Sequence, residues 1–215
     1  MGLKAGDVKY IIDRIDAVME ENREYLTELD SAIGDADHGI NMSKGFRAVS
    51  RKIKDIAVED IGVILKTVGI TLVSTVGGAS GPLYGTAFIR AGAEVSGKSE
   101  IDINDFAAML TGAEAGIKMR GRADLGDKTM IDAIEPALDA IKGGIDKGLS
   151  CDEILRLAAK SAQDGVEGTK NIQARKGRAS YLGERSIGHQ DPGATSSYLI
   201  FKTIYESVIE LENRY

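Results

Sequence analysis

The chain has 215 residues, of which 43% are hydrophobic and 28% charged. A chain of this length and composition can bury a substantial core without metals or disulfides, which excludes wholesale disorder, collagen and a simple coiled coil. The net charge is −6, so the molecule as a whole has no electrostatic attraction for nucleic acid or an anionic membrane. The single cysteine, Cys151, cannot form an intrachain disulfide, and the start of the sequence lacks a secretory signal. We therefore expect a cytoplasmic protein.

Glycine is frequent, at 26 residues, whereas proline occurs only 3 times. This balance indicates tight turns and close approach of the backbone to a ligand more than a flexible linker. The stretch from Thr67 to Ile89 carries no charge and is long enough to span a bilayer. Its centre is Gly-Gly-Ala-Ser-Gly-Pro at 77–82, and a helix broken there would leave backbone groups unsatisfied in lipid. We expect two buried helices that meet at a glycine loop.

Apolar residues recur at helical spacing along the chain. One face of the first segment, 7–28, carries Val8, Ile11, Ile12, Ile15, Val18 and Met19. Similar patterns predict helices over 39–54, 59–77, 82–96, 102–120, 129–147, 151–171 and 194–213. Ser150 with Glu153 forms a capping box, and Asp102 with Asp105 resembles one. No segment shows the sustained alternation that is typical of strands.

These patterns predict an all-α protein of eight helices in one domain, residues 1–215. Short connections favour antiparallel neighbours. Two connections, about 121–128 and 172–193, are longer and rich in Gly, Asp, Arg and Lys. Since long loops in compact domains usually carry function, we expect functional residues there.

Three carboxylates, Asp30, Asp35 and Asp37, lie within eight residues, with a glycine that lets the chain turn between them. They would repel one another at neutral pH unless a cation lay among them. Ligation by carboxylates alone favours Mg²⁺ or Ca²⁺ over zinc, and the spacing is not that of an EF-hand. The alternative is that these aspartates cap a helix and stay solvated. The third carboxylate, the flanking glycines and His38 favour the metal site.

Mg²⁺ held by carboxylates usually completes its shell with water and substrate phosphates, so the acidic cluster predicts a nucleotide. Residues 77–81 open directly into a helix, where free N–H groups and a helix N-terminus suit an anion. The segment from His38 to Asn41 begins a second helix and is another candidate. The glycine loop is equally compatible with a simple turn between helices.

Mixed charge and glycine also occupy the two long loops, at 120–130 and 174–178. Arginine recognises phosphate through planar, bidentate hydrogen bonds, although charged loop residues are more often only solvated. At 188–193, Asp191 and glycines again precede a helix. Helix capping by Asp191 is the simpler interpretation there, and it is compatible with ligand contact.

Residues 92–99, Gly-Ala-Glu-Val-Ser-Gly-Lys-Ser, satisfy the P-loop pattern. A P-loop follows a buried strand and opens a helix, whereas this segment is predicted to end a helix and is followed by acidic residues. We interpret it as a chance match. An independent ATPase that uses Lys98 stays open as an alternative, and it would require a parallel sheet.

Five motifs in order carry a family resemblance. They are Gly-Asp-Ala-Asp-His-Gly at 34–39, Gly-Pro-Leu-Tyr-Gly at 81–85, Gly-Asp-Lys-Thr-Met at 126–130, Ala-Ser-Tyr-Leu-Gly-Glu-Arg at 179–185 and Asp-Pro-Gly-Ala at 191–194. Together they resemble the L subunit of bacterial dihydroxyacetone kinase over about residues 7–210. Ala36 stands where members of that family often have glycine, and the flanking carboxylates are intact.

The resemblance implies an up-and-down barrel of eight antiparallel helices with a nucleotide and two Mg²⁺ ions at one end. Asp30, Asp35 and Asp37 match the metal ligands of the family. The positions that match its nucleotide contacts are His38, Gly39, Ile40, Asn41, Ala79, Ser80, Gly121, Met130, Arg178, Asp191, Pro192 and Gly193. We expect Arg178 to be the cation for the phosphates.

In the family, dihydroxyacetone is bound by a separate K subunit or domain, for which 215 residues leave no room. The chain therefore resembles the type that depends on the phosphotransferase system, in which bound ADP is a cofactor. The multiphosphoryl donor subunit would phosphorylate ADP in place, and ATP would pass the group to dihydroxyacetone on the K subunit. No residue of this chain is assigned as nucleophile or general base, and no direct contact with nucleic acid or membrane is expected.

Two further alternatives stay open. Family members of this kind can dock on a transcription regulator when they carry ADP, so the chain could be a regulatory binding module. The acceptor could also be a related short hydroxyketone, because acceptor selection lies on the partner subunit.

Overall fold

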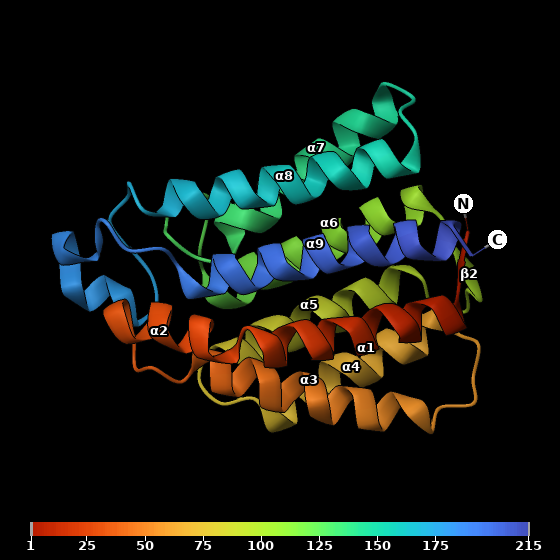
Figure 1. Cartoon of the computed structure of the whole chain (residues 1–215), viewed down its shortest axis with the longest axis horizontal. Helices are drawn as coiled ribbons and strands as arrows, with labels where there is room; N and C mark the ends of the chain where they lie inside the picture. Colours follow the sequence, from red (N-terminus) through yellow and green to blue (C-terminus); the bar gives the residue numbers. More distant parts are fainter. Residues whose placement is uncertain (1, 215) are drawn as a thin grey trace.

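The computed structural model describes residues 2–214, and most of them are helical (Figure 1). The helices are α1 (Ala5–Glu21), α2 (Arg23–Ile33), α3 (His38–Lys54), α4 (Ile61–Thr75), α5 (Ser80–Glu94), α6 (Ile103–Gly121), α7 (Ile131–Asp146), α8 (Cys151–Thr169) and α9 (Pro192–Glu212). A 3-10 helix, η1 (Arg178–Ser186), lies between α8 and α9. The strands β1 (Leu3–Lys4) and β2 (Glu100–Ile101) pair antiparallel near the chain termini. The prediction of an all-α protein is confirmed.

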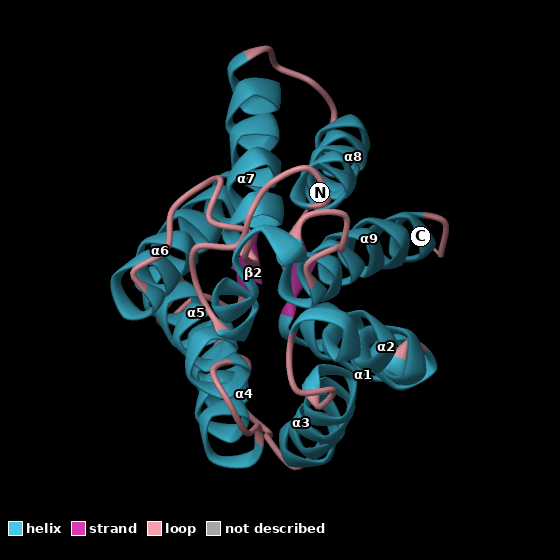
Figure 2. Ribbon diagram, turned by 90° about the vertical axis from the view of Figure 1, so that its left-hand side faces the viewer, coloured by secondary structure: helices cyan, strands magenta, loops and turns pink. Residues whose placement is uncertain are grey.

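All the α-helices except α2 pack in a closed ring, which Figure 2 shows nearly end on. Around the ring, α1 packs on α3, each helix from α3 to α8 packs on the one that follows it, and α9 packs on α1. Successive helices of the ring alternate in direction, as in an up-and-down arrangement. The connections 34–37, 76–79, 122–130 and 170–191 therefore gather at one end, opposite the termini. We call this the loop end of the barrel.

The prediction of one helix over 7–28 is wrong at its C-terminal end, because α1 stops at Glu21. The chain leaves helical geometry at Asn22, whose side-chain amide donates to the carbonyl of Val18 over 2.9 Å. A side chain that bonds the preceding turn competes with continuation of the helix. A separate helix, α2, follows, and its buried residues Leu26, Asp30 and Ile33 hold it at the loop end.

The long connection 172–193 is also more ordered than a loop, because it contains η1. Gly177 and Gly183 have φ values of 64° and 58°, so the segment turns too often to show a 3.6-residue period. A small apolar cluster holds η1 against α2; its members are Ile33, Ala174, Ala179 and Leu182.

The uncharged stretch from Thr67 to Ile89 forms parts of α4 and α5, which meet at the predicted glycine loop. The two helices approach very closely. A Cβ atom added at Gly69 would lie 2.5 Å from the carbonyl oxygen of Gly85, and one added at Gly92 would lie 2.7 Å from that of Gly62. Glycine is thus required on both sides of this helix contact. Within residues 2–214, no helix has both the length and the apolar character needed to cross a membrane.

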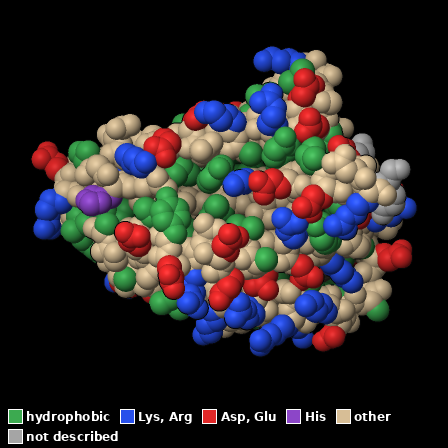
Figure 3. All heavy atoms as spheres, in the orientation of Figure 1, with side chains coloured by type: hydrophobic (Ala, Val, Ile, Leu, Met, Phe, Trp, Pro, Cys, Tyr) green, Lys and Arg blue, Asp and Glu red, His purple; other side chains and the backbone are tan. Residues whose placement is uncertain are grey.

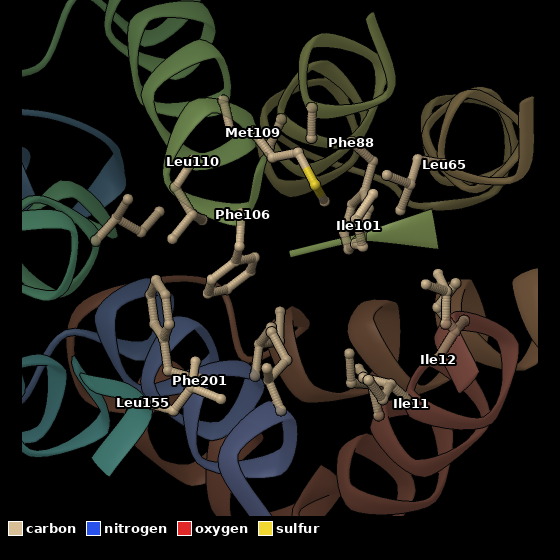
Figure 4. A pocket seen from close by; sticks show the side chains of 18 of the residues that line it. Ile11, Ile12, Leu65, Phe88, Ile101, Phe106, Met109, Leu110, Leu155 and Phe201 are labelled. Atoms are coloured by element: carbon tan, nitrogen blue, oxygen red, sulfur yellow. The ribbon is translucent and has the colours of Figure 1, made fainter. Parts of the chain in front are cut away.

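The barrel interior is not completely filled. An apolar cavity of about 160 Å³ lies between the helices. Figure 4 shows side chains from opposite walls pointing toward it, including Ile11, Leu65, Phe106, Met109 and Phe201. Tyr84 and Ser197 line the cavity as well.

The outer surface is mixed in charge. On the face drawn in Figure 3, Lys and Arg side chains alternate with Asp and Glu over the lower helices, and hydrophobic side chains lie between them. This face therefore has no broad field of one sign.

The structure excludes a P-loop at residues 92–99. The segment contains the last turn of α5, turns at Gly97 with a φ of 84°, and leads into the two-residue strand β2. The only sheet among residues 2–214 is the antiparallel pair β1–β2, and Lys98 forms an ion pair with Asp105. The alternative of a P-loop ATPase is therefore wrong.

Candidate functional site

The three predicted carboxylates meet at the loop end. One oxygen from each of Asp30, Asp35 and Asp37 lies within 4.8 Å of the others. Asp30 projects from α2, and the other two lie on the turn between α2 and α3. Asp30 is buried, whereas Asp35 is exposed, so the cluster opens toward solvent on one side.

The backbone around the cluster is shaped to hold it. Oδ2 of Asp30 accepts hydrogen bonds from the backbone N–H groups of Asp37 (2.9 Å) and His38 (3.1 Å). A Cβ atom at Gly34 would lie 2.0 Å from Oδ1 of Asp30, so only glycine fits there. Ala36 has a φ of 60°, the left-handed region that favours glycine. The turn thus accepts conformational strain in order to bring the carboxylates together.

Negative charges are crowded in this cluster. Partial burial, together with the neighbouring carboxylates of Asp35 and Asp30, raises the pKa of Asp37 above its ordinary value. On the other side, Nη2 of Arg178 in η1 forms an ion pair of 2.8 Å with Oδ2 of Asp35. The cluster and the basic loop are therefore in direct contact.

Four helices begin at the same end of the barrel: α3, α5, α7 and α9. The N-caps of α3 and α5, Asp37 and Ala79, form no side-chain hydrogen bond, whereas at the start of α7 the N–H of Ile131 donates to Oγ1 of Thr129 over 3.2 Å. Unpaired N–H groups and the positive ends of the helix dipoles make such termini suitable for anions. The fourth terminus is capped by Asp191, whose Oδ2 accepts from the N–H of Ala194 over 2.7 Å. The predicted cap at Asp191 is confirmed.

His38 ties three of these termini together. Its Nδ1 lies 3.1 Å from Oγ of Ser80 at the start of α5, and its Nε2 lies 2.8 Å from Oγ of Ser196 in α9. Burial lowers the pKa of His38 to about 4, so the ring is neutral at pH 7. A neutral ring has one N–H and one acceptor nitrogen, and it can therefore serve both contacts.

The network continues from Ser196 to Tyr84, whose hydroxyl lies 2.7 Å from Oγ of Ser196 and 2.9 Å from Oγ of Ser197. Burial raises the pKa of Tyr84 to about 12, so it is a neutral phenol. In the sequence, Tyr84 lies within the motif at 81–85, and nothing next to it indicates a role for its hydroxyl. The hydroxyl network connects the apolar cavity with the loop end.

The remaining predicted residues lie at the same end of the barrel. A Cβ atom at Gly77 would lie 3.4 Å from Oδ1 of Asn41, and one at Gly193 would lie 3.6 Å from the backbone N of Met130. Gly121 ends α6, where a Cβ atom would meet Leu83 of α5 at 3.2 Å. Gly39 packs α3 against α2, and Ile40 is 52% exposed. Pro192 is the first residue of α9.

Asp132 and Asp191 are further buried carboxylates at the loop end. Burial, opposed by its hydrogen bond from Ala194 and the nearby Lys128, raises the pKa of Asp191 to about 7. Its backbone N–H donates to Oγ1 of Thr169 at the end of α8 over 3.0 Å. This contact links α8 to the start of α9.

Sequence analysis missed the role of Lys128, although it lies inside one of the quoted motifs. Lys128 is only 1% exposed, with its ammonium among backbone carbonyls. Burial lowers the pKa of Lys128, and the carboxylates of Asp191 and Asp132 oppose this shift. A lysine that follows Gly126 and Asp127 is typical of a solvated loop, so the burial of Lys128 could be recognised only from the fold.

The fold and site define the class of the protein: an all-α barrel that gathers an acidic cluster, a basic loop and open helix N-termini at one end. Residues 32–206 match the DAK2 domain family. The chain belongs to this family.

Relatives of nearly full length support the assignment. The chain is 46% identical, over 91% of its length and 93% of that protein, to "PEP-dependent dihydroxyacetone kinase, ADP-binding subunit DhaL" of Escherichia coli (strain K12). It is 40% identical, over 88% of its length and 91% of that protein, to "PTS-dependent dihydroxyacetone kinase, ADP-binding subunit DhaL" of Lactococcus lactis.

A solved structure also matches. It is the dihydroxyacetone kinase from C. freundii in complex with AMP-PNP and Mg²⁺, with a TM-score of 0.71 and 28% identity over 93% of this chain. This chain spans about a third (33%) of that kinase.

Proposed function

We propose that this chain is the Mg²⁺- and ADP-carrying subunit of a phosphoenolpyruvate-dependent dihydroxyacetone kinase. It would accept a phosphoryl group from a donor subunit of the phosphotransferase system on bound ADP. It would then present ATP to dihydroxyacetone held on a K subunit. The observation that carries the proposal is the convergence of Asp30, Asp35 and Asp37 with the open N-termini of α3 and α5 at one end of the barrel.

The donor set fits Mg²⁺. All three candidate ligands are carboxylates, within 4.8 Å of one another, and hard divalent cations prefer oxygen ligands. Burial, together with the neighbouring carboxylates, raises the pKa of Asp37, and a cation would relieve the repulsion among these carboxylates. We propose that the three aspartates hold two Mg²⁺ ions, which would neutralise phosphate charge when bound.

The chain's own residues would bind and orient the nucleotide. The open N–H groups at residues 39–40 and 79–80 suit phosphate oxygens, and the N-terminal segment 191–193 of α9 adds a third wall. Arg178 would exchange its contact with Asp35 for the phosphates once Mg²⁺ neutralises the aspartates. Met130, Ile40 and Gly121 lie around the same opening and suit the less polar parts of the nucleotide.

The reaction would need little covalent chemistry from this chain. Phosphoryl transfer depends mainly on positioning and on stabilisation of charge, which the helix termini and Arg178 would supply. The acceptor hydroxyl would belong to the K subunit, so no base is assigned here. Choice of dihydroxyacetone over a related hydroxyketone would likewise rest on that partner.

A reconstituted assay tests the proposal. The chain is mixed with a K subunit, the donor subunit and a phosphoenolpyruvate-driven phosphotransferase system, and formation of dihydroxyacetone phosphate is measured. Asp30→Ala and Asp37→Ala should abolish turnover, whereas Asp139→Ala, at an exposed position of α7, should leave it unchanged. Normal turnover by the two site variants would refute the metal assignment.

The cofactor role has its own test. Purified protein is denatured and any released nucleotide is identified. Stoichiometric ADP supports a resident cofactor, whereas absence of nucleotide together with exchange of free ATP in every cycle supports an ordinary ATP-dependent kinase subunit. Binding of a transcription regulator is the second candidate role, and equal binding by ADP-loaded and empty protein would exclude a switch.

A further inference from the structure

Lys128 is a buried charge for which the proposed function has no role. It is 1% exposed and adopts a φ of 63°, an uncommon conformation for a residue with a side chain. Lysine is almost never fully buried unless its ammonium is paired. The surroundings of this ammonium therefore indicate what it does.

The partners of Nζ are three backbone carbonyls. Nζ donates to the carbonyls of Thr169 (2.5 Å), Ile172 (3.3 Å) and His189. An ammonium has three N–H donors and no acceptor, so the three carbonyls match its protonated form. Among the residues described, no carboxylate lies within ion-pair distance of Nζ.

These carbonyls belong to the two ends of one segment. We call residues 170–191 the strap; it runs from the end of α8 to the start of α9 and contains η1. Thr169 immediately precedes the strap, Ile172 lies near its beginning, and His189 lies near its end. One ammonium thus closes both ends of the strap onto the loop that precedes α7.

Neighbouring hydrogen bonds follow the same pattern. Within the strap, the N–H of Gly188 donates to the carbonyl of Lys170 over 2.7 Å. The N–H of Arg175 donates to the carbonyl of Asp127, next to Lys128, over 3.0 Å. Asp132 fixes the loop on the other side, since its carboxylate accepts from the N–H groups of Gly126 and Thr129, each over 2.7 Å. Lys128 is therefore held in place from both sides.

The strap carries two parts of the candidate site. Arg178 lies in η1 and contacts Asp35, and Asp191 ends the strap and caps α9. Loss of the ammonium would remove the donor of the carbonyls of Ile172 and His189, and would leave that of Thr169 with only the N–H of Ile172 at 3.5 Å. Carbonyls shielded from water are costly to leave unpaired. The strap would then separate from the loop at 126–130, and Arg178 would lose its fixed position.

We propose that Lys128 is a positioning residue for nucleotide binding, whose ammonium fastens both ends of the strap so that Arg178 and Asp191–Gly193 face the acidic cluster. The effect on nucleotide binding rests on the proposed function, whereas the fastening of the strap rests on the hydrogen bonds of Nζ. Lys128 should therefore affect ADP affinity by more than a change in the overall stability of the barrel would.

Hydrogen exchange of the nucleotide-free protein tests the mechanism. In Lys128→Met, which keeps the length of the side chain and removes its charge, amides of the strap should exchange at least about tenfold faster. Amides of α3 and α4 should be unchanged. Acceleration spread evenly over the barrel would overturn the proposal, because it would mean that Lys128 only stabilises the fold.

Calorimetric titration with ADP and Mg²⁺ tests the consequence. Residues that orient a first layer of ligands typically affect affinity by about 10- to 100-fold, and Lys128→Met should weaken ADP binding by that factor. Ile53→Ala, in the core at the opposite end of α3, is the control, because it destabilises the barrel without touching the strap. Equal loss of affinity in both variants would overturn the proposal.

Chemical rescue separates charge from volume. Lys128→Ala lacks three methylenes and an ammonium, so added propylammonium should restore ADP affinity and strap protection, and 1-propanol should not. Equal rescue by both compounds would overturn the proposal. If Lys128→Met does not fold, Lys128→Ala can be folded in the presence of propylammonium. Strap exchange and ADP affinity are then compared before and after the propylammonium is removed. If the unaltered protein binds no ADP, the proposed function fails, and the exchange experiment still decides the role of Lys128.

Discussion

Replacing Gly69 by alanine tests whether the α4–α5 contact is set by glycine. A Cβ atom there would lie 2.5 Å from the carbonyl oxygen of Gly85 and 2.9 Å from the backbone N of Ile89. Both are backbone atoms, so no side-chain rotation can relieve the contact. To reach an ordinary separation of about 3.4 Å, the two helices must move apart by about 0.9 Å, against a close-packed interior.

The magnitude follows from two opposing effects. Overpacking of this kind costs about 1–3 kcal/mol, and alanine in a helix interior gains up to about 1 kcal/mol over glycine. Gly143→Ala in α7 is the matched control, because a Cβ atom there meets nothing within 4 Å. Both variants gain the same helix propensity, so the difference between them isolates the clash.

Urea unfolding and thermal melts measure this difference. We expect Gly143→Ala to be about 0.5–1 kcal/mol more stable than the unaltered protein. Gly69→Ala should lie about 1–3 kcal/mol below Gly143→Ala, with a melting temperature about 2–12 °C lower. Equal stabilities of the two variants would refute the close approach of α4 and α5.

Three further predictions concern individual positions. Ala36→Gly should raise the free energy of unfolding by about 0.5–1 kcal/mol, since alanine is strained at a φ of 60°, and a decrease in urea unfolding would contradict the turn geometry. Folding lowers the pKa of His38 from 6.5 to about 4, so between these pH values the unfolded chain binds a proton at His38 and the folded chain does not. The free energy of unfolding should therefore fall by up to about 3 kcal/mol as the pH drops from 6.5 to 4. His38→Gln should flatten that part of the profile, whereas replacement of the exposed His189 should retain it. Ala113→Leu, which points into the cavity, should stabilise the protein by about 1 kcal/mol, and Ala137→Leu, buried away from the cavity, should destabilise it by about 1–3 kcal/mol; stabilisation by both would show that the interior is not packed as described.

The elements of the barrel could be predicted from the sequence because each helix buries one apolar stripe. Helix starts marked by a capping residue, such as Ser150 and Asp102, fall where the sequence placed them. The break at Asn22 could not be predicted, since the apolar pattern continues across it and only the burial of α2 separates the two helices. The helix η1 could not be predicted either, because its glycines interrupt any regular apolar period.

The candidate site divides in the same way. Residues adjacent in sequence, such as Asp35, Asp37 and His38, carry a local signal in charge and glycine spacing. Contacts between distant segments, such as His38 with Ser196, arise only when the ring of helices closes. The burial of Lys128 belongs to this second group, because the three carbonyls that accept from its ammonium lie more than 40 residues further along the chain.

The central claim is that the acidic cluster and the helix termini bind a divalent cation and a nucleoside diphosphate together. Titration calorimetry with ADP, in the presence of Mg²⁺ and then of EDTA, measures this directly. We predict that ADP binds with Mg²⁺, that EDTA abolishes binding, and that Asp37→Asn behaves with Mg²⁺ as the unaltered protein does with EDTA. The same ADP affinity under all three conditions would contradict the account.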